Sequence, residues 1–140
     1  MSARAVSRPR IDSMLIKVLR AKLHRARVTE ANVDYVGSIT LDPDIYEHVG
    51  LLPGEAVLVA DITNGQRFET YVLRGVRGSR TVCVNGAAAR LVRPGDVLIV
   101  MGFGYVTPDE AAALVPRIAV LDDRNEIVRD LEERPGETAG

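Results

Sequence analysis

The sequence predicts a mainly β fold with short helices, closed into a small barrel. Short apolar stretches bounded by turn residues recur along the 140-residue chain, and no alternation of long helices with strands marks βαβ units. Tryptophan is absent, and the aromatic residues are four tyrosines and two phenylalanines. Val, Leu, Ile and Ala must therefore fill the core, and side chains of this size suit the interior of a small barrel.

The first expected strand covers residues 17–28 and mixes apolar with basic side chains. Successive side chains of a strand point to opposite faces of its sheet. Strict alternation divides this strand into two sets: Lys22, His24 and Ala26, and Leu23, Arg25 and Arg27. The first set brings a lysine and a histidine together on one side of the sheet.

The middle of the chain is expected to hold three strands and one short helix. The strands are predicted over residues 38–41, 55–62 and 67–73. Asp42 followed by Pro43 is typical of a helix start, and Gly50 is typical of its end. Asn64-Gly65 is the strongest hairpin dipeptide in the chain, so the second and third of these strands are expected to pair.

The remaining strands are expected over residues 81–84, 97–103, 117–121 and 127–128, the last two pairing across residues 122–126. Asn85-Gly86 is a turn signal, and the alanines after it favour a turn of helix. Thr107-Pro108 is typical of the start of another short helix.

The composition excludes several classes of function. Eighteen basic residues nearly cancel nineteen acidic ones, leaving a formal net charge of −1, whereas a dedicated nucleic-acid binder is expected to be strongly basic. No apolar run approaches the roughly 20 residues of a membrane span, so neither nucleic acid nor a membrane is an expected partner. The sequence contains no HExxH or paired CxxC motif, so no metal site is predicted. The single cysteine, Cys83, excludes an intrachain disulfide and favours a cytoplasmic location.

The two ends differ in composition from the rest of the chain. Residues 1–13 are rich in Arg and Ser and almost free of large apolar side chains, which predicts a disordered N-terminal tail. An organellar transit peptide is a weaker interpretation of the same segment, because Pro9 interrupts an amphipathic helix. We expect one barrel domain over residues 14–130 and a flexible C-terminal tail over residues 131–140.

Five local motifs, in order along the chain, resemble one enzyme family. They are Lys22-Leu23-His24-Arg25, Tyr35-Val36-Gly37-Ser38, the stretch from Thr63 to Tyr71 (TNGQRFETY), Arg77-Gly78-Ser79-Arg80, and Asn85-Gly86-Ala87-Ala88-Ala89-Arg90 followed by Gly95-Asp96. Each motif alone is weak, but together they are specific. From about Met14 to Val128 the sequence resembles the pyruvoyl-dependent aspartate 1-decarboxylases.

This resemblance implies a double-psi β-barrel that assembles as a homotetramer, with active sites between neighbouring subunits. Members of the family are made as precursors that cut themselves before a serine, here between Gly37 and Ser38. The serine becomes a covalent pyruvoyl group, which forms a Schiff base with the substrate and needs no metal. The implied reaction decarboxylates L-aspartate to β-alanine and CO2, a step toward pantothenate and coenzyme A. A maturation factor is a candidate partner.

The chemistry explains the residue types at the implied cleavage site. The hydroxyl of Ser38 must attack the carbonyl carbon of Gly37, and glycine tolerates backbone dihedrals that a side chain forbids. The oxyanion that forms needs preorganised donors. By resemblance, the Asn85 amide and the Thr70 hydroxyl assist cleavage, and Tyr35 orients the cleavage loop.

The substrate brings two carboxylates and needs a proton donor after CO2 leaves. By resemblance, Tyr71 is that donor, and a positioned acid contributes about 10²–10⁴-fold in rate. Arg67 can hold a carboxylate with its bidentate fork, and Lys22 and His24 reach the same pocket. Thr70 and the small residues that follow Asn85 are expected to contact the substrate, the latter with backbone N–H groups: Gly86, Ala87 and Ala88.

Two other interpretations stay open at this stage. A noncatalytic, swapped-hairpin β-barrel regulator would use its basic cluster to bind DNA phosphates: Arg20, Lys22, Arg25 and Arg27. Alternatively, the chain keeps the enzyme fold but remains an uncut, inactive precursor. Each residue singled out above also has an ordinary structural explanation, as a turn, strand or solvated surface residue.

Overall fold

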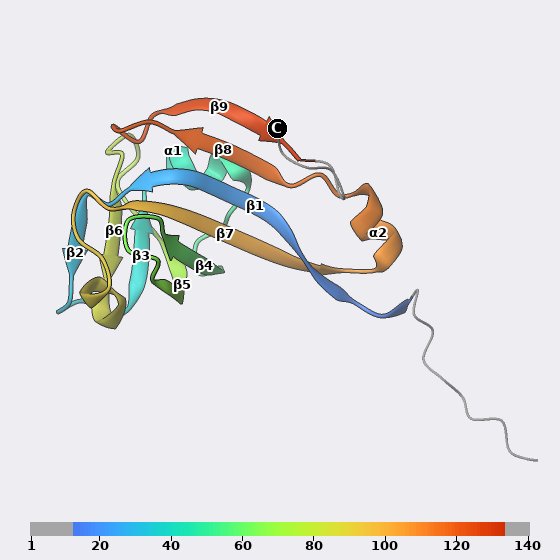
Figure 1. Ribbon diagram of the computed structural model, residues 1–140, viewed down its shortest axis with the longest axis horizontal. Coiled ribbons are helices and arrows are strands. Elements are labelled where there is room, and N and C mark those ends of the chain that lie inside the picture. Colours follow the sequence, from blue (N-terminus) through green and yellow to red (C-terminus); the bar gives the residue numbers. More distant parts are fainter. Residues whose placement is uncertain (1–12, 134–140) are drawn as a thin grey trace, which may run out of the picture.

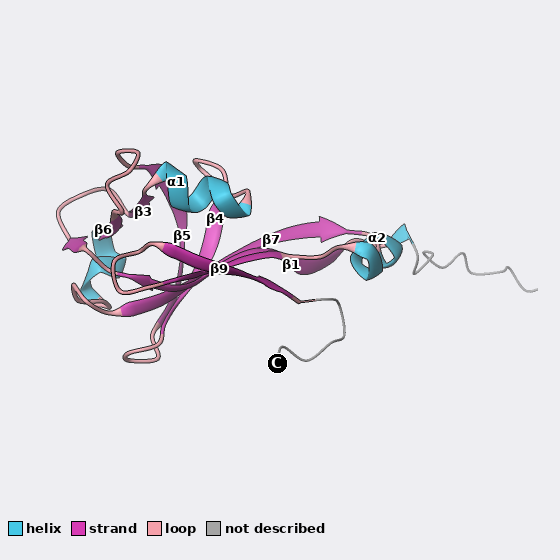
Figure 2. Cartoon of the chain, turned by 90° about the horizontal axis from the view of Figure 1, so that it is seen from above, coloured by secondary structure: helices cyan, strands magenta, loops and turns pink. Residues whose placement is uncertain are grey.

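The computed structural model describes residues 13–133, and it is mainly β with short helices, as the sequence predicts (Figures 1 and 2). The strands are β1 (Ile16–Arg27), β2 (Glu30–Asn32), β3 (Ser38–Leu41), β4 (Ala56–Asp61), β5 (Arg67–Arg74), β6 (Val82–Asn85), β7 (Val97–Val106), β8 (Arg117–Leu121) and β9 (Ile127–Glu132). The helices are α1 (Pro43–Tyr46), α2 (Pro108–Ala113) and the 3-10 turns η2 (Glu47–Val49) and η3 (Gly86–Arg90).

The nine strands form one sheet in the order β2-β6-β3-β5-β4-β7-β1-β8-β9. β1 and β2 are separated by only two residues, Val28 and Thr29, and the Thr29 amide already donates to the carbonyl of Val82 at 2.8 Å. One nearly continuous segment therefore pairs with β7 through β1 and with β6 through β2. This segment closes a ring of six strand positions, and β8 and β9 extend the sheet outside it.

Large aliphatic side chains fill the closed ring, as the scarcity of aromatic residues predicts. The fully buried side chains include Leu23, Ile39, Leu41, Val57, Val59, Val72, Leu98 and Val100. β1 and β7 pair from Ile16 opposite Val106 to Arg27 opposite Val97. Their far ends run beyond the barrel as a two-stranded arm, with α2 at its tip (Figure 1).

The predicted division of the first strand into two faces is wrong after His24. Arg25 has a left-handed backbone with φ of 71°, and the register between β1 and β7 shifts between His24 and Ala26. This β-bulge moves the residues after it to the opposite face. Ala26 is therefore buried in the core with Leu23, while Lys22 and His24 remain together on the outer face.

The local signals for turns and caps are confirmed. β4 and β5 form the hairpin around Asn64-Gly65, and Gly65 has φ of +79°. Asp42 caps α1 by accepting a hydrogen bond from the Asp44 amide at 2.8 Å. Thr107 caps α2 in a complete capping box with Glu110, and β8 pairs with β9 as predicted.

The predicted ends of the domain need one correction. The C-terminal tail was expected to begin at residue 131, but Leu131 and Glu132 belong to β9, where they pair with Ile118 and Arg117. Residues 1–12 and 134–140 of the predicted tails lie outside the described residues. The short strand β2 and the last three residues of β7 were not predicted.

Candidate active site

The Gly37–Ser38 peptide bond lies at a boundary between exposed and buried chain. The loop before it is open to solvent, with Tyr35 54% and Val36 70% exposed, whereas Ser38 is 0% exposed. Ser38 is the first residue of β3, and its hydroxyl donates to the carbonyl of Val36 at 2.9 Å. The hydroxyl is thus held inside the protein, directly after a loop that is exposed to solvent.

The Asn85 side chain contacts this serine directly. Ser38 and Asn85 are opposite each other in the antiparallel pair of β3 and β6, so their side chains share one face of the sheet. The Asn85 amide nitrogen donates to Ser38 Oγ and to Thr40 Oγ1, both at 3.0 Å. Asn85 precedes η3 but makes no side-chain cap bond, although asparagine is a preferred cap residue. Its amide is committed to the serine instead.

Gly86 allows the scissile segment to approach this asparagine. Gly86 has φ of +75°, and a Cβ built there would lie 2.5 Å from the Cα of Gly37 and 2.7 Å from its nitrogen. Only glycine leaves room for this contact. The backbone that follows Asn85 therefore supports Gly37 from one side. In the same helical turn, Ala87 is exposed and Ala88 packs against the core.

Two of the predicted residues on β5 lie beside β3, but on opposite faces. The parallel pairing aligns Ile39 with Val72, so Ser38 and Tyr71 are one residue earlier on adjacent strands, about 4.8 Å apart in backbone spacing. Tyr71 shares the outer face with Ser38. Thr70 lies on the inner face, and within the described residues no hydrogen bond joins its hydroxyl to the scissile peptide.

The predicted cationic residues are not brought to Ser38 within one chain. Arg67 is exposed on the outer face of β5, four residues and about 13 Å before Tyr71. Lys22 and His24 are on β1, which is separated from β3 by β5, β4 and β7 in one direction round the ring and by β6 and β2 in the other. By the shorter way, His24 still precedes Glu30, the first residue of β2, by six residues, or about 20 Å along the segment.

His24 has an unusual electrostatic environment. Partial burial, followed by the positive charges of Lys22, Arg25 and Arg129, lowers its pKa below the ordinary histidine value. Its Nδ1 is buried and has no hydrogen-bond partner among the described residues. The imidazole is therefore neutral at neutral pH and offers a ligand a hydrogen bond rather than a charge.

Two residues at the site were missed by the sequence analysis. Thr40 accepts the second hydrogen bond of the Asn85 amide, and the Cys83 thiol donates to Asn85 Oδ1 at 3.2 Å. Thr40 follows Ser38 by two residues, and Cys83 precedes Asn85 by two residues. That spacing places each on the same strand face as its neighbour, but the signal becomes usable only once the pairing of β3 with β6 is known.

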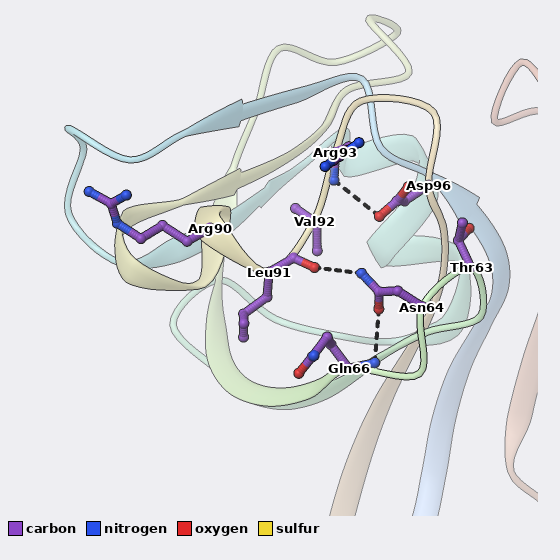
Figure 3. A pocket seen from close by; sticks show the side chains of 8 residues that line it. All are labelled: Thr63, Asn64, Gln66, Arg90, Leu91, Val92, Arg93 and Asp96. Carbon is purple, nitrogen blue, oxygen red and sulfur yellow. Dashed lines mark hydrogen bonds between the residues drawn. The ribbon is translucent and has the colours of Figure 1, made fainter.

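A separate pocket of 390 Å³ lies between the β4–β5 hairpin and the segment after η3 (Figure 3). Its two walls are tied by the Asn64 amide, which donates to the Leu91 carbonyl at 2.8 Å. None of the predicted site residues lines it. Asp96 lines this pocket; burial, and then the neighbouring Asp96 carboxyl, raise the pKa of Asp61 to about 6.

The groups gathered at Ser38 are a hydroxyl, an amide and a peptide carbonyl. Within residues 13–133, no group of three or more His, Cys, Asp or Glu side chains is placed to hold a metal ion. By contrast, the buried Ser38 hydroxyl has an amide donor at 3.0 Å and a glycine carbonyl as its covalent neighbour.

Within residues 13–133, no helix has the length and apolar character needed to cross a membrane.

Fold and site together define a small closed β-barrel in which a buried serine, directly after a glycine, is held by an asparagine amide. The model of the family described as aspartate decarboxylase matches residues 14–128. The chain belongs to the aspartate decarboxylase family.

Curated relatives agree with this assignment over most of their length. The chain is 54% identical to the aspartate 1-decarboxylase of Caldicellulosiruptor saccharolyticus, covering 83% of this chain and 91% of the relative. It is 53% identical to that of Bacillus cytotoxicus, with 84% and 93% covered, and 49% identical to that of Acetivibrio thermocellus, with 89% and 99% covered. Among solved structures it is similar to the rationally designed protein mkDPBB_sym_86, with a TM-score of 0.43, 21% identity, and coverage of 64% and 94%.

Proposed function

We propose that this enzyme decarboxylates L-aspartate to β-alanine and CO2, using a pyruvoyl group made from Ser38 after self-cleavage of the Gly37–Ser38 bond. Membership of the family supports the reaction. The observation that carries the site is the 3.0 Å hydrogen bond from the Asn85 amide to the buried Ser38 hydroxyl, beside a Gly37 that only a glycine at position 86 allows to approach.

Self-cleavage begins when Ser38 Oγ leaves the Val36 carbonyl and attacks the carbonyl carbon of Gly37. The C–N bond breaks, the hydroxyl proton passes to the freed amine, and an ester replaces the amide. Loss of the Cα proton of Ser38 then expels the Gly37 carboxylate and leaves dehydroalanine. Water converts the dehydroalanine to pyruvoyl and releases ammonia. The Asn85 amide serves as a donor to the oxyanion at Gly37, and the Thr70 hydroxyl joins it only where the Gly37 carbonyl reaches the inner face of β5.

The pyruvoyl group supplies an electrophilic carbonyl that accepts the electron pair released with CO2. Tyr71, on the strand next to Ser38, returns a proton to the substrate carbon. Arg67 and Lys22 bind the two carboxylates of aspartate, and the neutral imidazole of His24 donates or accepts a hydrogen bond. The backbone amides after Asn85 hold the substrate close to the reacting carbon.

We further propose a homotetramer in which neighbouring subunits share each site. Lys22 and His24 are too far from Ser38 along the sheet of their own chain for their side chains to meet a common substrate, so a second copy must supply them. A complementation experiment tests this. Lys22→Ala and Ser38→Ala chains, each inactive alone, should regain activity when folded together, because one mixed site retains both Lys22 and Ser38. Mixtures that stay inactive would contradict shared sites.

The first test of the function is intact mass spectrometry under denaturing conditions. Two fragments, residues 1–37 and 38–140, are expected, with the mass of a pyruvoyl in place of serine on the larger one. Ser38→Ala should remain one chain and produce no β-alanine from aspartate. A cleaved or fully active Ser38→Ala protein would end the proposal. A single intact wild-type chain would point to a maturation factor, tested by adding cell extract.

The cytoplasm is the proposed location and coenzyme A synthesis the proposed pathway, with Cys83 free and buried as a reducing compartment permits. DNA binding is less well supported than catalysis. Two of the four basic residues considered for DNA binding already interact with groups of the same chain. Arg20 binds Glu55 and the Gly50 carbonyl, and Arg27 pairs with Asp123 at 2.9 Å.

A further inference from the structure

The Asn85 amide has all of its hydrogen-bonding groups committed. Its two N–H groups have two acceptors, Ser38 Oγ and Thr40 Oγ1, each at 3.0 Å. Its oxygen has one donor, the thiol of Cys83 at 3.2 Å. Asn85 is 3% exposed and Cys83 is 7% exposed, so water does not replace these partners easily.

An amide can face a site in either of two orientations, and its partners decide between them. Ser38 already donates its only hydrogen to the Val36 carbonyl, so it can only accept from Asn85. Turning the amide around would leave its oxygen against Ser38 without a donor and would direct the NH2 group at a sulfur, which is a weak acceptor. A thiol on the other side favours the observed orientation, because it donates to the oxygen.

The thiol keeps its hydrogen under ordinary conditions. Burial, and then the negative charge of Glu30 on the adjacent strand β2, raise the pKa of the Cys83 thiol. The S–H group therefore remains a donor at neutral pH. Glu30 is an alternative acceptor for this hydrogen, and a side-chain hydrogen bond to it contributes to the raised pKa. Glu30 is exposed, however, whereas the Asn85 oxygen is buried at 3.2 Å from the sulfur.

We propose that Cys83 and Thr40 are positioning residues: Cys83 fixes the Asn85 amide with its nitrogen toward Ser38, and Thr40 holds the amide in place by accepting its second N–H group. This inference rests on the proposed function, because the step that it serves is the attack of Ser38 on Gly37. Neither residue touches the reacting atoms. Each acts by holding the amide so that it donates where negative charge develops.

The test removes each hydrogen-bonding group and follows the rate of self-cleavage by intact mass spectrometry. Thr40→Val keeps the shape of the side chain, and Cys83→Val adds one γ carbon; each should slow cleavage by about tenfold, the effect of one ordinary hydrogen bond. Cys83→Ser and Thr40→Ser restore a hydroxyl and should return the rate to within about threefold of wild type. Val84→Ala is the matched control. Val84 lies between Cys83 and Asn85 on β6 but faces the core. Truncating its side chain therefore destabilises the fold without removing a contact of the amide.

A second readout does not depend on cleavage. Hydrogen exchange of the Asn85 side-chain amide, measured by NMR at equal extents of cleavage, should be about tenfold faster in Cys83→Val than in wild type or Val84→Ala. Unchanged exchange and cleavage in both valine variants would overturn the positioning role. If the wild-type chain stays uncut even after cell extract is added, the proposed function fails, and the exchange measurement still decides whether Cys83 and Thr40 hold the amide.

Discussion

The contact between Gly86 and Gly37 allows a quantitative prediction. An alanine at position 86 would adopt φ near +75°, which costs an L-residue about 1–2 kcal/mol. Its Cβ would also lie 2.5 Å from the Cα of Gly37, and the backbone movement that relieves such an overlap costs about 1–3 kcal/mol more. We expect Gly86→Ala to lower the free energy of unfolding by about 2–5 kcal/mol. Self-cleavage should fall by about 100-fold, the effect of a displacement near 1 Å.

Gly54→Ala is the matched control. Gly54 has φ of +84° but nothing within 4 Å of a built Cβ, so it carries the backbone cost of about 1–2 kcal/mol alone. Urea unfolding of both variants in a Ser38→Ala background, at one protein concentration, compares their stabilities without the complication of cleavage. Intact mass time courses with Ser38 present compare their rates. If Gly86→Ala and Gly54→Ala lost the same amount of stability, and Gly86→Ala cleaved itself at the wild-type rate, the role given to this contact would be refuted.

Three further outcomes are expected. Tyr71→Phe should spare self-cleavage but lower kcat by about 10²–10⁴-fold, since the proton donor is lost; normal β-alanine production would remove the role. Arg67→Ala should raise KM for aspartate at least tenfold, because a bidentate carboxylate contact is lost, whereas an unchanged KM would place the carboxylate elsewhere. Asp61 has a pKa raised from 3.8 to about 6, so its contribution to stability declines as pH rises through that window, by up to about 2.5 kcal/mol. Asp61→Asn should therefore gain stability relative to wild type between pH 4 and pH 6, measured by urea unfolding. A difference that is constant with pH would show that the carboxyl does not titrate there.

The predictions that succeeded from sequence depend on local chemistry. A hairpin at Asn64-Gly65, a cap at Asp42 and a capping box at Thr107 each follow from a few adjacent residues, whose dihedrals and side-chain bonds do not depend on the rest of the chain. The pairing of β8 with β9 is equally local, because a short turn joins the two strands.

The features that escaped prediction depend on contacts between distant segments. Nothing in the residues around Arg25 marks it as a β-bulge, since a positive φ there follows from its register against β7. The hydrogen bonds that Asn85 makes to Ser38 and Thr40 join segments 47 and 45 positions apart. The residue types at the site were predictable only through family resemblance. The commitment of Cys83 to the amide oxygen required the β3–β6 register.

The closure of the barrel through β1 and β2 has a consequence for the proposed cleavage after Gly37. The smaller fragment would carry both of these strands, which pair with β6, β7 and β8, and so it would be a structural component rather than a released propeptide. Once cut, the protein is a complex of two polypeptides, and its unfolding becomes a dissociation that depends on concentration. The chain folds once as a continuous polymer. After cleavage, its persistence in the cell is governed by how slowly it unfolds, because the connectivity that guided folding no longer exists.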